Sequence, residues 1–346
     1  MASKYRLKLW PYIKLQTIAD NIKIDDPNWD IVDDNFSINK NLFNYQKEAL
    51  ENAVKVLWKY FADLQENKKI FAKYYDDLDI LEDLNVSLKN NRHAGLLKEY
   101  FEPQINDKGE EYIPFSEICN RMSFWMATGS GKTIVIIKLI ELLHKLIKSG
   151  SIPRKEILFL TYSGDLIESF KELVKEYNHD KPLDKQIQLV SLKDYEKEKS
   201  QKTLVNRVFY YRSDLITDER TDNKLNFDEY LEVVNNKKTG NWYLILDEAH
   251  KGDKQDSKRQ NIFSILSKNG FLFNFSATFT HAIDIVTTVY NFNLEQFIKS
   301  GYGKQIYVSQ EEVNAFKEAA DFNEKEKRKI ILKTLIVLSA IKKAYG

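Results

Sequence analysis

This sequence has one cysteine, no long apolar run and almost no net charge. Its single cysteine, Cys119, excludes a disulfide framework and favours a reducing compartment. No run of about 18 apolar residues occurs, and no signal-type apolar segment follows Met1, so neither a membrane span nor a secretory leader is predicted. We therefore expect a protein of the cytoplasm with no membrane partner.

Opposite charges are nearly equal in number. The 52 Lys and Arg residues offset 51 Asp and Glu residues, which leaves a net charge of +1. No global basic field attracts nucleic acid, so contact with it would need a local patch. The length of 346 residues exceeds one typical domain, but a single α/β core with insertions can absorb most of it.

One stretch carries recognisable chemistry. A short apolar run enters a glycine-containing loop, and a second apolar-rich stretch follows, which is typical of a strand, a phosphate-binding loop and a helix. The loop reads Met126-Ala127-Thr128-Gly129-Ser130-Gly131-Lys132-Thr133. Gly129 and Gly131 allow consecutive N–H groups to face an anion at the positive end of the helix. Lys132 would reach the β- and γ-phosphates, and the Thr133 hydroxyl would bind Mg²⁺.

The loop departs from the strict phosphate-loop pattern at one position. Met126 stands where that pattern has its first glycine. The alternative interpretation is an ordinary Gly-Ser turn before a helix. The strand, loop and helix in the correct order favour a phosphate site that includes Thr128, Gly129, Ser130 and Gly131.

A second and a third apolar strand also end in polar residues. Residues 243–246 lead into Asp247 and Glu248, with His250 two positions later. Two carboxylates at a strand end are typical of a phosphate-hydrolysing site: Asp247 would hold Mg²⁺, and Glu248 would orient and deprotonate water. His250 could relay the nucleotide state to neighbouring strands by hydrogen bonding.

The third strand, 271–275, leads into Ser276 and Thr278, whose hydroxyl groups can bond carboxylates at a neighbouring strand end. A plain strand end is the alternative for this short pattern.

Upstream, Asn44 is predicted to cap a helix through residues 45–64, where apolar residues recur three and four positions apart. Gln46 lies in the first turn of this helix. Its amide complements an adenine edge, and a nearby aromatic ring can cover the base. A solvent-exposed first-turn glutamine is the alternative, and the sequence leaves both open.

Strand and helix patterns alternate after the loop. Further buried strands are predicted at 157–162, 187–190 and 208–211, which gives an α/β fold with a mostly parallel central sheet flanked by helices. We expect domain limits at four places: a leading segment at 1–42, the main domain at 43–282, a charged helical insertion in it at about 66–118, and a linker with a C-terminal helical extension at 283–346.

Taken in chain order, these motifs resemble the Q motif and motifs I, II and III of superfamily two helicases and translocases. The matching residues are Gln46, Ala127 to Thr133, Asp247-Glu248-Ala249-His250 and Ser276-Ala277-Thr278. That superfamily hydrolyses ATP between two RecA-like domains and moves along nucleic acid. The resemblance implies a RecA-like fold, ATP and Mg²⁺ as cofactors, and adenine recognition by Gln46. It also implies that Ser276 and Thr278 couple hydrolysis to strand movement.

The motif variants resemble one branch of this superfamily, the Res subunit of type III restriction enzymes. Met-Ala-Thr-Gly-Ser-Gly-Lys-Thr together with Asp-Glu-Ala-His favours it, as does the absence of proline soon after Thr278. A type I restriction motor places a nuclease before motif I, and residues 1–120 contain no Asp…Glu-X-Lys nuclease core. A helicase that acts on RNA is the further alternative. The resemblance implies double-stranded DNA and a modification methyltransferase subunit as partners.

Two parts of the type III pattern are not found in the 346 residues: a second RecA-like domain with the arginine-bearing motif VI, and a nuclease. We expect a portion of a longer protein or the product of a split gene, which binds ATP, hydrolyses it weakly and does not translocate. A missing arginine of this kind costs about a thousandfold or more in rate.

The contacts to nucleic acid are less well defined by the sequence. Residues 161–163 lie where motif Ia would touch the backbone, and Lys251, Lys254, Lys258 and Arg259 could contact phosphates or form a solvated loop. A competing function is a nucleotide-gated module that selects a partner without motor activity. A P-loop small-molecule kinase is disfavoured, because it does not predict Ser-Ala-Thr after Asp-Glu-Ala-His.

Overall fold

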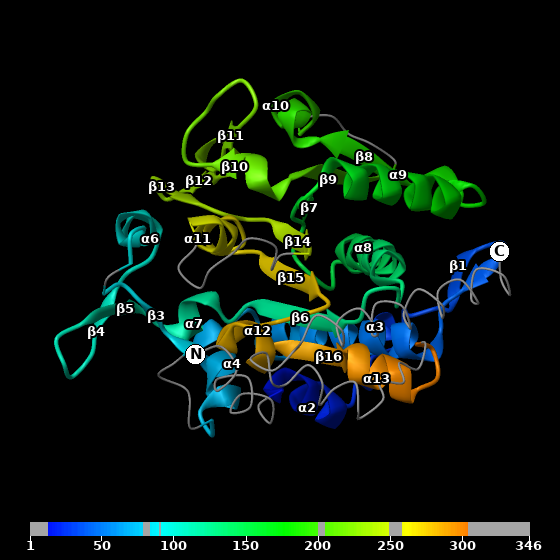
Figure 1. Ribbon diagram of the computed structural model, residues 1–346, viewed down its shortest axis with the longest axis horizontal. Coiled ribbons are helices and arrows are strands. Elements are labelled where there is room, and N and C mark those ends of the chain that lie inside the picture. Colours follow the sequence, from blue (N-terminus) through cyan, green and yellow to red (C-terminus); the bar gives the residue numbers. More distant parts are fainter. Residues whose placement is uncertain (1–12, 79–83, 90, 200–204, 249–257, 304–346) are drawn as a thin grey trace, which may run out of the picture. The chain divides into compact units, whose positions relative to one another are not determined.

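The apolar runs of the sequence become the strands of one parallel sheet. The computed structural model describes residues 13–78, 84–89, 91–199, 205–248 and 258–303, to which all structural statements refer. In spatial order the strands are β16 (Thr288–Phe292), β6 (Arg121–Met126), β15 (Phe271–Ser276), β14 (Tyr243–Asp247), β7 (Ile157–Thr161), β9 (Asn206–Arg212) and β8 (Ile187–Ser191). Figure 1 shows them stacked from β16 near the bottom to β8 near the top.

Every neighbouring pair in this sheet runs parallel. The inner strands β6, β15, β14 and β7 are buried along their whole length, because helices cover both faces of a parallel sheet. The predicted α/β class with a mostly parallel central sheet is confirmed. Parallel strands also bring their carboxyl ends to a common edge, so polar residues that follow different strands lie close together.

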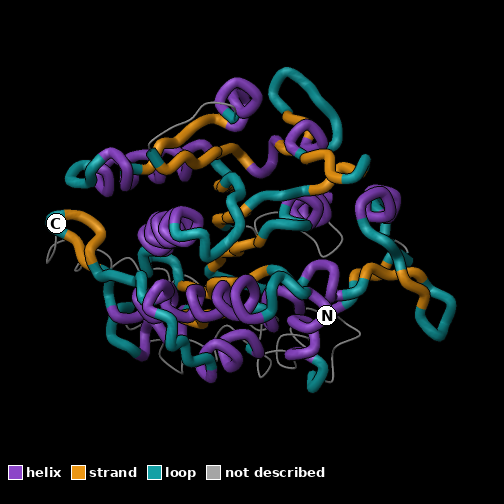
Figure 2. The backbone as a smooth tube through the Cα atoms, turned by 180° about the vertical axis from the view of Figure 1, so that it is seen from behind, coloured by secondary structure: helices purple, strands orange, loops and turns teal. Residues whose placement is uncertain are grey.

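Helices surround the sheet and provide most of the connections (Figure 2). They are α2 (Lys14–Asn21), α3 (Asn44–Leu57), α4 (Lys68–Ala72), α6 (Ala94–Tyr100), α7 (Phe115–Ile118), α8 (Lys132–Lys148), α9 (Gly164–Asn178), α10 (Tyr195–Glu198), α11 (Lys258–Leu266), α12 (Ala282–Val286) and α13 (Leu294–Lys299). A π-helical segment, η3 (Trp58–Asp63), continues α3. The short 3₁₀ turns are η2 (Pro27–Trp29), η4 (Lys73–Tyr75), η5 (Leu183–Lys185), η6 (Leu192–Asp194), η7 (Ser213–Leu215) and η8 (Phe227–Tyr230).

Helix α8 anchors the leading segment through ion pairs. The carboxylate of Asp33 lies 2.8 Å from Nζ of Lys138 and 2.9 Å from Nζ of Lys145. Glu141 pairs with both lysines, and Lys138 is fully buried. The hydrogen bonds and charges of the two lysines outweigh burial and lower the pKa of Asp33 from 3.8 to about 2. Residues 13–42 therefore pack on the main body.

The charged insertion contains more than the helices expected from its sequence. Beside α4, α6 and α7 it forms a small antiparallel sheet. Its strands are β3 (Val86–Ser87), β5 (Glu111–Ile113) and β4 (Gln104–Ile105). The β4–β5 hairpin, which projects from the body in Figures 1 and 2, turns at Gly109, whose positive φ of 73° favours glycine. The other small pairs are β1 (Asn35–Ser37) with β2 (Lys40–Asn41), β10 (Ile216–Thr217) with β11 (Leu225–Asn226), and β12 (Glu232–Val234) with β13 (Lys237–Thr239).

The sheet continues past residue 282, where we expected the main domain to end. Strand β16 pairs in parallel with β6, and α2 and α3 pack against it. The expectation of only linker and helix after 282 is therefore wrong for residues 288–292, which carry the β-branched and aromatic residues typical of a strand. The expected C-terminal helical extension lies outside the described residues.

No helix in the described ranges is both long enough and apolar enough to cross a membrane.

Candidate nucleotide-binding site

The loop between β6 and α8 has the backbone conformation that its glycines allow. Gly129 and Gly131 have φ values of 83° and 76°, in the left-handed region that a Cβ disfavours. The Ser130 hydroxyl donates to the carbonyl of Ala127 at 2.7 Å and closes the turn. Thr128 and Gly129 are exposed, and Ser130 is buried. The loop opens directly into the first turn of α8, which begins with Lys132 and Thr133.

Lys132 and Glu248 approach each other from two strand ends. The Lys132 ammonium lies 3.4 Å from Oε1 of Glu248 and 3.5 Å from the carbonyl of Met126. Both side chains are mostly buried, with exposed fractions of 10% and 14%. The two contacts are longer than the 2.7–2.9 Å usual for charge-assisted hydrogen bonds, so the ammonium is held loosely.

Glu248 has a strained backbone. Its φ of 59° lies in the left-handed region, which is uncommon for a residue with a side chain. The Glu248 N–H donates to the carbonyl of Phe275 at 3.1 Å, so the neighbouring strand helps to hold this conformation. Asp247, the last residue of β14, lies between Thr161 and Phe275 in the sheet register and is 7% exposed. Both carboxylates therefore stand at the carboxyl edge of the sheet.

The loop after β15 is fastened to the strand that precedes the phosphate loop. Ser276 donates its hydroxyl to the Thr278 carbonyl at 2.8 Å and accepts from the Thr278 N–H at 3.0 Å. Trp125, which pairs with Ser276 in the sheet, donates its ring N–H to the Ala277 carbonyl at 3.0 Å. The coupling roles of Ser276 and Thr278 stay predictions. His250 lies outside the described residues, as do Lys251 and Lys254.

Gln46 reaches the phosphate loop. Its Oε1 accepts from the Phe43 N–H at 3.0 Å, and its Nε2 donates to the carbonyl of Ser130 at 3.0 Å. The side chain is 1% exposed, so the solvent-exposed alternative is wrong. A Cβ at position 131 would lie 2.5 Å from Nε2 of Gln46, so Gly131 also makes room for this contact. Adenine recognition by Gln46 stays a prediction.

The first turn of α3 differs from our expectation. Phe43, not Asn44, occupies the N-cap position, and its N–H is satisfied by the side chain of Gln46 three residues later. A reach-back bond of this kind is typical of a glutamine at the third helical position.

Aromatic rings that the sequence analysis did not assign lie beside the loop. Tyr45 stacks on Phe292 at a centroid distance of 4.2 Å, and its hydroxyl donates to the Ser130 carbonyl at 2.9 Å. Burial and the nearby Tyr302 raise the pKa of Tyr45 to about 12, so its hydroxyl stays protonated at neutral pH. Phe43 and Tyr302 are the exposed members of this group. The sequence could have indicated Tyr45, because it directly precedes Gln46. Phe292 was missed because strand β16 was not predicted.

At the carboxyl ends of β7 and β9 lies a second group of polar residues. Ser163 caps α9 by accepting from the Leu166 N–H, so its hydroxyl is committed to the helix. Tyr162 is 39% exposed, and the Arg259 guanidinium lies 6.0 Å from its ring. Arg212 forms a two-pronged ion pair with Asp214. Of the expected basic patch, Lys258 pairs with Asp218, which favours the solvated interpretation for that residue.

The residues present fit a magnesium–nucleotide complex. Mg²⁺ in such sites takes one or two protein ligands and completes its shell with phosphate oxygens and water. Thr133 and Asp247 supply a hydroxyl and a carboxylate of that kind, and Lys132 supplies a cation for the phosphates. Among the described residues no group of three or more His, Cys, Asp or Glu could hold a metal ion alone.

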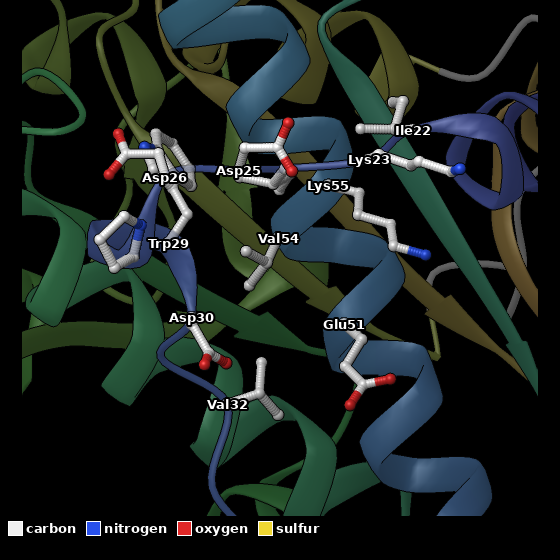
Figure 3. A pocket seen from close by; sticks show the side chains of 12 residues that line it. Ile22, Lys23, Asp25, Asp26, Trp29, Asp30, Val32, Glu51, Val54 and Lys55 are labelled. Carbon is white, nitrogen blue, oxygen red and sulfur yellow. The ribbon is translucent and has the colours of Figure 1, made fainter.

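A separate hollow of about 640 Å³ lies between residues 22–32 and α3 (Figure 3). Four carboxylates line it together with two lysines, Trp29 and aliphatic side chains. The carboxylates belong to Asp25, Asp26, Asp30 and Glu51. None of the predicted site residues contributes to its wall, so it is distinct from the phosphate loop.

Comparison with known proteins places these features in one family. A family model described as "Type III restriction enzyme, res subunit" matches residues 39–281, which is more than half of the chain. The matched range contains Gln46, the loop after β6, the acidic pair after β14 and Ser276 with Thr278. A search of curated proteins found no match.

Proposed function

Because the chain belongs to the family of type III restriction enzyme Res subunits, with its helicase-like motor domain at 39–281, we propose that it binds and hydrolyses ATP and acts on double-stranded DNA. The observation that best supports this is the 3.4 Å approach of Lys132 to Glu248. A phosphate-binding cation and a general base from different strands stand together at the strand ends, where α/β proteins bind nucleotides.

The proposed roles follow from these positions. Backbone N–H groups of residues 128–131 and the start of α8 would surround the phosphates. Lys132 would leave Glu248 and move to the β- and γ-phosphate oxygens, because a multiply charged phosphate attracts the ammonium more strongly than one carboxylate does. Glu248, released from the lysine, would orient the attacking water and accept its proton.

Thr133 and Asp247 would hold the magnesium ion, whose charge would stabilise the phosphate oxygens during hydrolysis. Gln46 would recognise the adenine while keeping its bond to Ser130. His250 would belong to the same catalytic group, and Ser276 and Thr278 would transmit the nucleotide state to the DNA-binding side. Residues 43–282 together with β16 would form the first of two RecA-like domains.

Contacts to DNA are proposed at the ends of β7 and β9. Tyr162, Arg259 and Arg212 offer an exposed ring and guanidinium groups of the kind that contact nucleic-acid backbones. By family membership, the partner protein would be a modification methyltransferase subunit. A location in the cytoplasm is also part of the proposal.

A titration with fluorescent ATP and Mg²⁺ tests the nucleotide site. We expect saturable binding by the wild type, binding weakened about a hundredfold by Lys132→Ala, and normal binding by Lys148→Ala, a control at the opposite end of α8. Lys148 bonds the carbonyl of Asp184, away from the loop. Equal affinity of the wild type and Lys132→Ala would contradict the proposal.

The same titration with double-stranded DNA separates a motor from a nucleotide-gated module. A motor predicts that DNA changes the affinity for ATP, whereas a module that only selects a protein partner predicts no change. Hydrolysis is measured in parallel. The absence of ATP hydrolysis, both with and without DNA, would contradict the proposed activity.

A further inference from the structure

The carbonyl oxygen of Ser130 receives two hydrogen bonds from the start of α3. Tyr45 donates from its hydroxyl at 2.9 Å, and Gln46 donates from its side-chain amide at 3.0 Å. All three residues are buried, with exposed fractions of 6%, 1% and 1% in the order Tyr45, Gln46 and Ser130. Two donors on one carbonyl hold it far more firmly than a single bond to water would.

Fixing this carbonyl also fixes the direction of the next N–H. The peptide bond between Ser130 and Gly131 is trans, as are all those described. In a trans peptide plane the C=O and the N–H point in opposite directions. With the Ser130 oxygen held towards α3, the Gly131 N–H faces away from α3, which is the side where a phosphate would be bound.

The tyrosine ring has little freedom to move its hydroxyl elsewhere. It stacks on Phe292 at 4.2 Å with an interplanar angle of 13°, and on Phe43 at 5.6 Å with 11°. The ring of Tyr302 stands edge-on at 4.8 Å. Phe292 is itself tied to the loop, because its carbonyl accepts from the Ala127 N–H at 2.9 Å. The loop is thus held at Ala127 by β16 and at Ser130 by Tyr45.

We propose that Tyr45 is a positioning residue of the phosphate loop, whose hydroxyl orients the 130–131 peptide so that the Gly131 N–H faces the nucleotide phosphates. This proposal rests on the proposed function, which supplies the nucleotide as the ligand. Gln46 donates to the same Ser130 carbonyl, but it is also proposed to contact adenine, so replacing Gln46 would change the affinity in a way that depends on the base. The effect of Tyr45 acts through the phosphates and is independent of the base.

Tyr290 provides a matched control. The Tyr290 side chain is also 6% exposed. Its hydroxyl also makes one hydrogen bond, to the carboxylate of Glu48 at 3.0 Å, and Glu48 lies on α3 like Tyr45. Tyr45→Phe and Tyr290→Phe each remove one oxygen atom and one hydrogen bond, and both keep their rings. A purely structural role for Tyr45 predicts similar behaviour of the two variants in every measurement.

The first measurement is hydrogen exchange without nucleotide, followed on peptides that cover residues 126–134. Loss of one hydrogen bond corresponds to roughly three- to tenfold in an equilibrium constant, so we expect exchange to accelerate by about that factor in Tyr45→Phe. Tyr290→Phe should exchange like the wild type over the same peptides. Equal exchange in all three proteins would overturn the proposal.

The second measurement compares the affinities for ATP and GTP. Tyr45→Phe should weaken both by the same factor, roughly three- to tenfold, and leave their ratio unchanged. Weakening of ATP alone would show a contact with the base and overturn the proposal. If the wild type bound neither nucleotide, the proposed function would be overturned. Faster hydrogen exchange of the loop in Tyr45→Phe would in that case still support the positioning role of Tyr45.

Discussion

Two partly buried lysines stand at opposite ends of the central strands and are held in different ways. Lys68, near the amino ends of β6 and β15, donates to the carbonyls of Glu117 at 2.8 Å and Lys268 at 2.6 Å. Lys132, beyond the carboxyl end of β6, has contacts of 3.4 and 3.5 Å with Glu248 and Met126. Short bonds to carbonyls fix the first lysine, whereas the contacts of the second are longer than the 2.7–2.9 Å usual for charge-assisted hydrogen bonds.

The difference indicates what each end of the sheet does. Asn120 and Arg121 behave like Lys68: their side chains donate to carbonyls of Ser267, Gly270 and Ile118 at 2.8 Å. These bonds satisfy helix and loop ends, as structural polar groups do. At the carboxyl end, Glu248 has a strained backbone, which is typical of residues at functional sites.

Replacing Glu248, the proposed general base of the Lys132–Glu248 pair, should give the largest effect. Glu248→Gln keeps the shape of the side chain but cannot accept a proton, so we expect ATP hydrolysis to fall about 10²- to 10⁴-fold. Binding of ATP should persist. Single-turnover hydrolysis with excess protein measures this. Glu295→Gln, which replaces an exposed glutamate on α13, is the control. Unchanged hydrolysis in Glu248→Gln would remove that residue from the catalytic group.

Lys132→Ala should lower the affinity for ATP by about a hundredfold, because it removes charge-assisted bonds to phosphate worth about 3 kcal/mol. Its melting temperature should stay close to that of the wild type, since the present contacts of Lys132 are long. The check is calorimetric titration beside thermal unfolding. A large loss of stability without a loss of affinity would reverse the roles assigned to the two lysines.

Lys68→Met should lose stability and keep its affinity for ATP, the opposite of Lys132→Ala. It removes the donor to the part-buried carbonyls of Glu117 and Lys268, of which the second keeps only a longer bond from Asn120 at 3.3 Å, so the free energy of unfolding should fall by about 1–3 kcal/mol while ATP affinity is unchanged. Chemical denaturation and the ATP titration check the two halves of this prediction. A fall in ATP affinity with no loss of stability would place Lys68 among the ligand-binding residues.

The stabilities of the wild type and Lys68→Met can also be compared at alkaline pH. Burial lowers the pKa of Lys68 from 10.5 to about 8. Between these values the folded protein binds fewer protons at Lys68 than the unfolded chain, so the stability of the wild type gains from rising pH. Lys68→Met lacks this gain. The stability difference should therefore widen from pH 8 to 9.5, by less than about 1.4 kcal/mol per pH unit. A constant difference would contradict it.

Gln46 is an intermediate case, with short bonds of the structural kind inside the proposed ligand site. Gln46→Met keeps the length of the side chain but loses its bonds to the Phe43 N–H and the Ser130 carbonyl. We expect the smallest effect here, a loss of ATP affinity of roughly three- to tenfold, because Tyr45 still donates to the Ser130 carbonyl. Equilibrium binding of ATP measures it. No change in affinity would separate Gln46 from the nucleotide.

The sequence predicted the inner part of the fold well, for a physical reason. Strands β6, β7, β14 and β15 are buried along their whole length, and each contains a run of apolar residues. The residues that follow them could be placed at one edge because parallel strands end there together. The 3.4 Å approach of Lys132 to Glu248 agrees with that reasoning.

The errors come from elements whose signal is local or weak. Asn44 is a good capping residue by type, but the helix begins one residue earlier, with Phe43 at the N-cap and the Gln46 side chain bonded to its N–H. The strands of the insertion have two or three residues each, too few for a periodic pattern. Strand β16 was missed because its five residues include Thr288 and Asn291 and so form no continuous apolar run, and Tyr45 because its hydroxyl partner lies 85 residues away.

The pairing of β16 with β6 affects any shortened version of this protein. A polypeptide that stopped at residue 281, where the family match ends, would lack β16. Strand β6 would then present a row of unpaired backbone groups, which invites association with other chains. The Ala127 N–H would lose its acceptor at the same time. Truncation at the limit of the recognisable motifs would therefore damage solubility and the phosphate loop together, whereas a chain that kept β16 would retain both the pairing with β6 and the acceptor for Ala127.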